Sequence, residues 1–109
     1  MIVIYMMNRN DLDFFMIQDF EWDDGNRQKS RVKHRVDPRE CEEVFFNKPL
    51  WAHADEKYSQ KELRYHALGV TNHGRKLFLS FTIRAHRLRV ISARDQSREE
   101  RKLYENQTK

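Results

Sequence analysis

The feature that most constrains the fold is the alternation of apolar and polar side chains through residues 64–93. The run "RYHALGVT" (64–71) is followed by "KLFLSFTIR" (76–84) and then by "HRLRVISA" (86–93). A period of two is typical of strands that are buried on one face only. The connection "NHGR" contains Gly74, which suits a short hairpin. These segments predict an antiparallel meander of three strands.

The same alternation predicts which side chains face the core. The two faces of the middle strand are Leu77, Leu79, Phe81 and Ile83 on one side, and Phe78, Ser80, Thr82 and Arg84 on the other. In the third strand, Leu88 and Val90 point inward, and Arg87 and Arg89 point outward. Strict alternation would then bury Arg94, and a buried unpaired guanidinium is costly. The third strand is therefore expected to end by Ala93.

Three segments predict helices. Residues 26–35 are basic with little apolar content, and "DPRECEEVFF" (37–46) begins with a capping box and a proline at the first helical position. The core stripe of this second helix is Cys41, Val44 and Phe45. Ser97 and Glu100 form another capping box, which predicts a terminal helix to about residue 106.

Short strands are expected at residues 20–22 and in "LWAH" (50–53). The helices most simply cover the apolar face of the sheet, so the predicted fold class is α+β with the helices on one face. At 109 residues the chain is one domain. Residues 1–18 are predicted to be an N-terminal extension, with Met16 as an alternative start, and residues 19–109 to be the domain.

Charge is distributed unevenly along the chain, whose net charge is +4. Residues 1–24 contain six acidic residues and one basic residue, whereas residues 25–36 contain five basic residues and no acidic one. Residues 84–109 contain eight basic and four acidic residues. Two basic segments favour an anionic partner, with nucleic acid first and a membrane surface second. Solvated charged faces are the alternative.

Familiar catalytic and metal-binding motifs do not occur in the sequence. It has no Walker loop, no HExxH, no CxxC and no GxSxG, and its five histidines are not paired at helical spacing. The single cysteine, Cys41, is expected to be a buried thiol and excludes an internal disulfide. No apolar run reaches transmembrane length. The chain is thus expected in the cytoplasm, with no metal and no cofactor.

The remaining chemistry is a set of cations with His and Tyr nearby. RNA cleavage without a metal needs a base for the 2′-hydroxyl, an acid for the leaving 5′-oxygen, and cations for the phosphate oxygens. Arg and Lys suit the last role, and His and Tyr can carry protons. The composition permits this reaction. Nucleic-acid binding without catalysis is the alternative.

Several stretches together resemble the BrnT toxins, the ribonuclease halves of bacterial type II toxin–antitoxin modules. They are "FEWD", "KH", an acidic helix ending in "VFF", the pattern E-x-R-Y-x-x-x-G, and "RVISARDQSREERKLYE". The resemblance runs from about Phe20 to Glu105. It implies a RelE-like fold, metal-independent RNA cleavage and growth arrest. It also implies neutralisation by a BrnA-type antitoxin of the ribbon-helix-helix class, with the complex binding operator DNA.

The resemblance also implies site residues, which by position are Lys33, His34, Glu62, Arg64, Arg89, Arg94, Arg98 and Tyr104. The roles that follow are our hypotheses. Arg64, Arg89 and Arg94 would bind and stabilise the scissile phosphate. His34 or Tyr104 would carry a proton, and Lys33 would hold the flanking RNA backbone. The further substrate-binding candidates are Arg87 on the third strand and Arg98 on the terminal helix.

Two departures from the family pattern bear on these expectations. The family usually reads "KHG", whereas this chain has Arg35 in place of the glycine, which should alter the turn after the basic helix. The loop before E-x-R often carries a histidine, and Tyr58 stands there. A non-catalytic nucleic-acid-binding partner that only represses with its antitoxin is therefore the alternative function, and a purely electrostatic interaction protein is a third.

Overall fold

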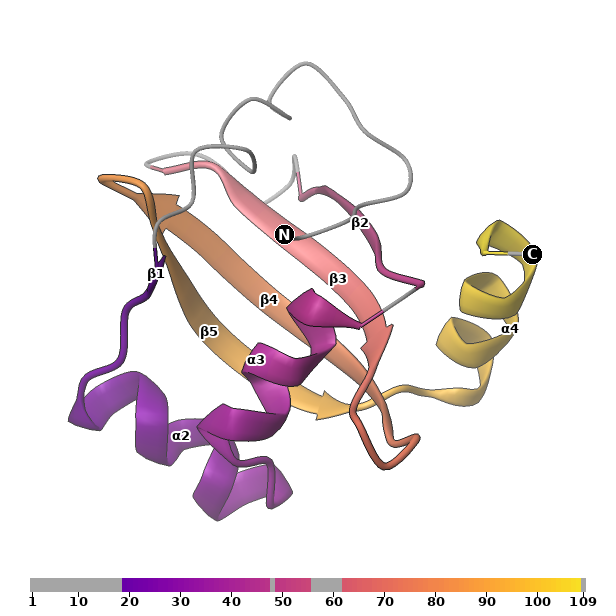
Figure 1. Ribbon diagram of the computed structural model, residues 1–109, viewed down its shortest axis with the longest axis horizontal. Coiled ribbons are helices and arrows are strands. Elements are labelled where there is room, and N and C mark those ends of the chain that lie inside the picture. Colours follow the sequence, from indigo (N-terminus) through magenta and orange to yellow (C-terminus); the bar gives the residue numbers. More distant parts are fainter. Residues whose placement is uncertain (1–18, 48, 56–61, 109) are drawn as a thin grey trace.

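The computed structural model describes residues 19–47, 49–55 and 62–108, which form one sheet with helices around it (Figure 1). The elements in chain order are β1 (Asp19–Phe20), α2 (Asp24–His34), α3 (Pro38–Phe46), β2 (Trp51–Ala54), β3 (Arg64–Val70), β4 (Lys76–Arg84), β5 (Arg87–Asp95) and α4 (Arg98–Gln107). The predicted extension, residues 1–18, lies outside the described residues. No helix in the described part of the chain is long and apolar enough to cross a membrane.

The sheet of the described residues has the strand order β1-β5-β4-β3-β2. β3, β4 and β5 form the predicted antiparallel meander, and β2 pairs with β3 in antiparallel orientation. β1 pairs with β5 in parallel, so the sheet is mixed. The predicted α+β class is confirmed. The strand expected at 20–22 is only two residues long and starts one residue earlier.

A bulge in β5 changes which of its side chains face the core. Phe81 of β4 lies opposite Val90, but the preceding Ser80 lies opposite Ser92. Ile91 is therefore an extra residue in β5. An extra residue shifts the two-residue alternation by one position, so the side chains beyond it exchange faces.

The bulge explains why the predicted end of this strand is wrong. β5 continues past Ala93 to Asp95, and Ala93 is fully buried. Arg94 is not buried with it, because its guanidinium lies on the opposite, polar face, 4.2 Å from the centre of the Phe78 ring. Arg89 and Arg94 are five positions apart, and strict alternation would separate them. The bulge brings both onto one face.

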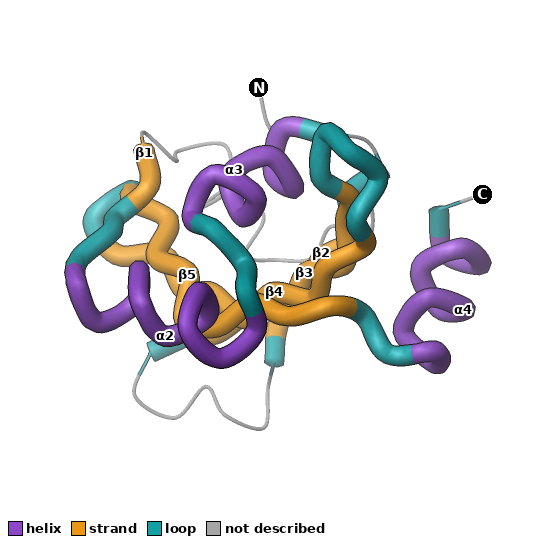
Figure 2. The backbone as a smooth tube through the Cα atoms, turned by 90° about the horizontal axis from the view of Figure 1, so that it is seen from below, coloured by secondary structure: helices purple, strands orange, loops and turns teal. Residues whose placement is uncertain are grey.

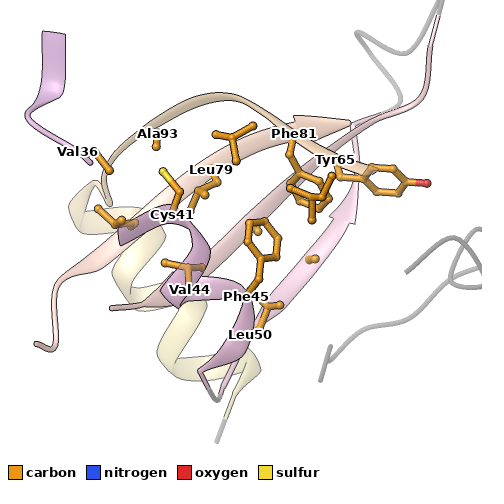
Figure 3. Packing of buried hydrophobic residues seen from close by; sticks show 14 residues of the cluster. Val36, Cys41, Val44, Phe45, Leu50, Tyr65, Leu79, Phe81 and Ala93 are labelled. Carbon is orange, nitrogen blue, oxygen red and sulfur yellow. The ribbon is translucent and has the colours of Figure 1, made fainter. Parts of the chain in front are cut away.

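The core lies between α3 and the apolar face of the sheet (Figure 3). The predicted stripe of Cys41, Val44 and Phe45 is buried, with no residue more than 1% exposed. Phe45 meets Phe81 edge to face, with ring centres 5.0 Å apart. α3 packs tightly against the sheet at Gly69, where an added Cβ would lie 2.5 Å from Val44 Cγ1. A larger residue there would displace α3 from the sheet.

The Cys41 thiol belongs to this core and carries no chemistry at neutral pH. Burial, with smaller contributions from the neighbouring carboxylates of Glu40 and Glu42, raises its pKa to about 12. The predicted buried thiol is confirmed.

α2 covers the edge of β5 that β1 is too short to pair. Three hydrogen bonds continue this edge, from Glu21 N–H to Leu88 O (2.9 Å), from Asn26 Nδ2 to Val90 O (3.0 Å) and from Ala93 N–H to Ser30 Oγ (2.7 Å). Two of these bonds flank the bulge. Asn26 and Ser30 are buried although they are polar, because they replace a strand as partners of β5. The helix begins two residues earlier than predicted, since Asp23 caps it.

α4 lies at the β2–β3 end of the sheet, away from α2 and α3 (Figure 2). The side chain of Tyr104 packs with Trp51, Leu68 and Phe78, which belong to the polar face. The expectation that all helices pack on one face is therefore wrong: α3 covers the apolar face, α2 an edge, and α4 one end of the other face. The predicted capping box at Ser97 is confirmed, since Ser97 and Glu100 bond reciprocally.

The turn after α2 is made by Arg35 in the position where the related family has glycine. Arg35 adopts a left-handed conformation with φ 54°, and its N–H donates to Arg31 O at 3.0 Å. Arg75 holds this turn by donating to Arg35 O at 2.9 Å, while it pairs with Asp95 and Glu40. A non-glycine residue in this conformation costs about 1–2 kcal/mol.

Candidate nucleic-acid interface

Two adjoining cavities lie between α2 and the polar face of the sheet. One, of about 260 Å³, is lined by Lys29, Ser30, Lys33, His34, Ser92, Ala93 and Arg94. The other, of about 250 Å³, is lined by Gly25, Asn26, Lys29, Glu62, Arg64, Arg84, Arg89 and Ile91. Lys29 lines both. We call the two cavities together the basic groove.

Arg89 is largely enclosed in the groove, with a side chain 19% exposed. Its Nη1 donates to Glu21 at 3.1 Å and lies 2.8 Å from an Asp23 carboxylate oxygen. The hydrogen bond to Arg89 lowers the pKa of Asp23, and the pair raises the pKa of Arg89. Because both contacts use Nη1, the Nε and Nη2 donors of Arg89 make no hydrogen bond within the described part of the chain.

Arg94 is fixed by α4 from the other side. Its Nη1 and Nη2 donate to the two oxygens of Glu100 at 2.8 and 3.1 Å, and its Nη1 also donates to Asp95 O. Burial raises the pKa of the Glu100 carboxyl, but the hydrogen bonds from Arg94 and Ser97 together lower it. The bidentate pair and the Phe78 ring hold the guanidinium in one orientation.

Glu62 and Arg84 form a second bidentate pair, which lines the groove. Arg84 donates from Nε and Nη2 to the two Glu62 oxygens at 2.7 and 2.9 Å. The bond from Arg84 lowers the pKa of Glu62. Arg64 lines the same cavity and lies across β4 from Arg89, since each of them is opposite Thr82.

Two lysines of α2 complete the groove. Lys29 and Lys33 are one helical turn apart and therefore lie on the same side of α2. Both are exposed, and neither forms an ion pair with any residue that the structure describes. The sequence-based prediction included Lys33 and missed Lys29. The four-residue spacing of the two lysines was the signal that could have found it.

A row of polar side chains crosses the same sheet face beside the groove. His53, His66, Ser80 and Ser92 lie opposite one another on four neighbouring strands. Ser92 lines the groove, and His66 stands two strands away across the small Ser80. Pattern reading passed over His66, because a lone histidine in an alternating strand gives no signal. In residues 19–47, 49–55 and 62–108, no three His, Cys, Asp or Glu side chains gather to hold a metal ion.

Comparison with known families identifies the family of the chain. Residues 22–100 match the family described as the ribonuclease toxin, BrnT, of type II toxin–antitoxin systems. The chain belongs to the BrnT family. No curated protein sequence matches it. The family assignment implies an antitoxin partner, and it confirms the resemblance inferred from the motifs.

Of the eight predicted catalytic and substrate-binding residues, five line the groove. They are Lys33, His34, Arg64, Arg89 and Arg94. The other three lie elsewhere. Arg87 donates to Asp19 at 2.8 Å and so fastens β1 to β5, while Arg98 is exposed at the start of α4 and lines neither cavity.

Tyr104 is the one suggested proton carrier that the fold keeps away from the groove. It is 4% exposed, and its hydroxyl donates to Pro49 O at 2.5 Å. Its ring fills the apolar cluster under α4. Tyr104 is therefore a packing residue in this fold. Tyr58, which replaces a frequent histidine of BrnT toxins, lies outside the described residues.

Proposed function

We propose that this BrnT protein cleaves single-stranded RNA at a phosphate bound in the basic groove, without a metal ion. The observation that supports this most is the convergence of Lys29, Lys33, Arg64, Arg89 and Arg94 on two cavities that share a wall. Cations fixed in place before the reaction stabilise negative charge that grows on phosphate oxygens in the transition state. An exposed lysine pair at the groove wall can neutralise the neighbouring phosphates.

The arginines of the groove would share this work. Arg89 can give its Nε and Nη2 donors to a phosphate while Nη1 stays on its carboxylates. Arg94, oriented by Glu100, would contact the same or the adjacent phosphate, and Arg64 would approach from β3. His34, which lines the cavity with Arg94, would give a proton to the leaving 5′-oxygen.

The salt dependence of RNA binding tests the groove directly. The probe is a fully 2′-O-methylated single-stranded RNA, which keeps the phosphates and cannot be cleaved through the 2′-oxygen. If Lys29 and Lys33 each contact a phosphate, the Lys29→Ala/Lys33→Ala variant should lower the slope of log affinity against log salt by about 1.4. The matched control is Arg27→Ala/Arg31→Ala, which removes two charges from α2 outside the groove lining. Equal slopes for both variants would refute the assignment.

Cleavage itself is tested in cells and with purified protein. Induction of the chain alone should arrest bacterial growth with RNA decay, and Arg94→Ala should relieve the arrest. Arg94→Ala removes a partly exposed ion pair and a ring contact, so its stability loss should be only about 1–2 kcal/mol. Normal growth with abundant folded wild-type protein would favour the non-catalytic co-repressor.

The partner would be a BrnA-type antitoxin of the ribbon-helix-helix class. Its acidic residues would cover the basic groove, and the complex would bind operator DNA in the cytoplasm. Co-expression should reverse the arrest. Charge reversal at Lys29 and Lys33 should then weaken the toxin–antitoxin complex, and an unchanged affinity would place the antitoxin on another face.

A further inference from the structure

The row beside the groove contains a histidine that is held by a carboxylate. His66 of β3 places Nε2 3.0 Å from Oδ2 of Asp55, which directly follows β2. The Asp55 side chain is only 10% exposed, and that of His66 is 28% exposed. In the neutral imidazole this contact is an Nε2–H donated to Asp55, so Nδ1 has the free lone pair. No residue in the described part of the chain hydrogen-bonds to that nitrogen.

The surroundings of His66 favour the neutral imidazole. Burial lowers the pKa of His66 below 6.5, and the nearby His53 and Arg94 act in the same direction. The carboxylates of Asp55 and Glu100 oppose this effect but do not outweigh it. Two rings pack beside the imidazole, His53 at 5.4 Å and Phe78 at 4.9 Å between ring centres. At neutral pH the side chain is therefore a proton acceptor with a fixed tautomer.

His66 also lies within reach of the cations of the groove. Its ring and the Arg94 guanidinium contact the same Phe78 ring, at 4.9 and 4.2 Å from the ring centre. In the row that runs from His66 to the groove, the next side chains are the small Ser80 and Ser92. An RNA backbone lying over these serines would meet His66 on one side and Arg94 with α2 on the other.

We propose that His66, positioned by Asp55, is the base that accepts the 2′-hydroxyl proton in the RNA cleavage proposed above, on which this inference rests. The 2′-oxygen forms a bond to phosphorus as its proton moves to Nδ1 of His66. The bond from phosphorus to the 5′-oxygen breaks, and that oxygen takes a proton from His34. The products are a 2′,3′-cyclic phosphate and a 5′-hydroxyl, so the protons and electrons balance without a further reactant.

Single-turnover cleavage of a labelled RNA tests this role. His66→Gln keeps a polar side chain of similar size but cannot accept the proton, and it should lower the rate constant by about 100-fold or more. Its affinity for the 2′-O-methylated RNA should stay within twofold of wild type. Asp55→Asn should lower the rate at least tenfold, because the amide no longer selects the Nε2–H tautomer. His73→Gln, at an exposed turn outside the groove lining, is the matched control and should cleave at the wild-type rate.

The pH profile separates a catalytic role from a structural one. The wild-type rate should fall as acid protonates His66, and this acidic limb should disappear in His66→Gln. A folded His66→Gln protein that cleaves within threefold of wild type would overturn the proposal and leave the ribonuclease function standing. Wild-type protein that binds RNA but never cleaves it would overturn the ribonuclease function as well. If His66→Gln fails to fold, a wild-type rate that shows no acidic limb at any pH at which the protein stays folded would by itself refute the role.

Discussion

Asn26→Asp is the sharpest test of how α2 is attached to the sheet. The Asn26 side chain accepts from Asp23 N–H at 2.8 Å and donates to Glu21 O and to Val90 O, both at 3.0 Å. Aspartate has the same shape and keeps the acceptor, but it turns a carboxylate oxygen toward two carbonyl oxygens. Each lost bond that leaves a buried group unpaired costs about 1–3 kcal/mol. We therefore expect a loss of about 3–4 kcal/mol in the free energy of unfolding.

Thermal melting at pH 7 measures this loss. A domain of this size loses about 4–8 °C per kcal/mol, so the variant should melt at least 12 °C below wild type. The difference should shrink near pH 4, because a protonated carboxyl can again donate one hydrogen bond. Gln28→Glu makes the same charge change on an exposed position of α2 and should melt within 2 °C of wild type. An Asn26→Asp protein that melts within 3 °C of wild type at pH 7 would refute the edge contact.

Four further outcomes follow from the fold. Arg35→Gly should raise the free energy of unfolding by about 1 kcal/mol in a denaturant titration, since glycine adopts φ 54° without strain. Tyr104→Phe should lower the free energy of unfolding by about 1 kcal/mol, because the hydrogen bond to Pro49 is lost, and should leave any RNA cleavage rate unchanged. A large loss of rate would indicate that Tyr104 takes part in catalysis. Cys41, with a pKa of about 12, should react with a thiol reagent at pH 8 only at the rate of unfolding. By NMR, His66 should titrate below 6.5. Its protonation therefore opposes folding, so stability should fall as the pH drops from 6.5 through the folded pKa, and a titration above 6.5 would contradict this.

Local patterns were sufficient wherever a structure depends on neighbours in the chain. The meander was predictable because a two-residue period and the "NHGR" turn specify pairing between adjacent segments. The helix at Pro38–Phe46 and its stripe were predictable because capping and helical spacing act within a few residues. The family could be recognised from motifs alone, and five of the predicted site residues line the groove.

Long-range contacts decided the rest. Strict alternation would bury Arg94, so the strand was expected to end by Ala93. Instead, the bulge at Ile91, held on both sides by Asn26 and Ser30 of α2, lets the strand continue with Arg94 on the same face as Arg89. The side of the sheet that α4 covers was predicted wrongly, because the few apolar residues of this helix fit either face. The pairing of His66 with Asp55 depends on the register between β3 and the end of β2, and no spacing along the chain encodes it. The sequence by itself determined the strands, the helices and the family of this protein. The tertiary structure decided which charged side chains share a surface, because a single extra residue in a strand reverses the faces of the residues that follow it.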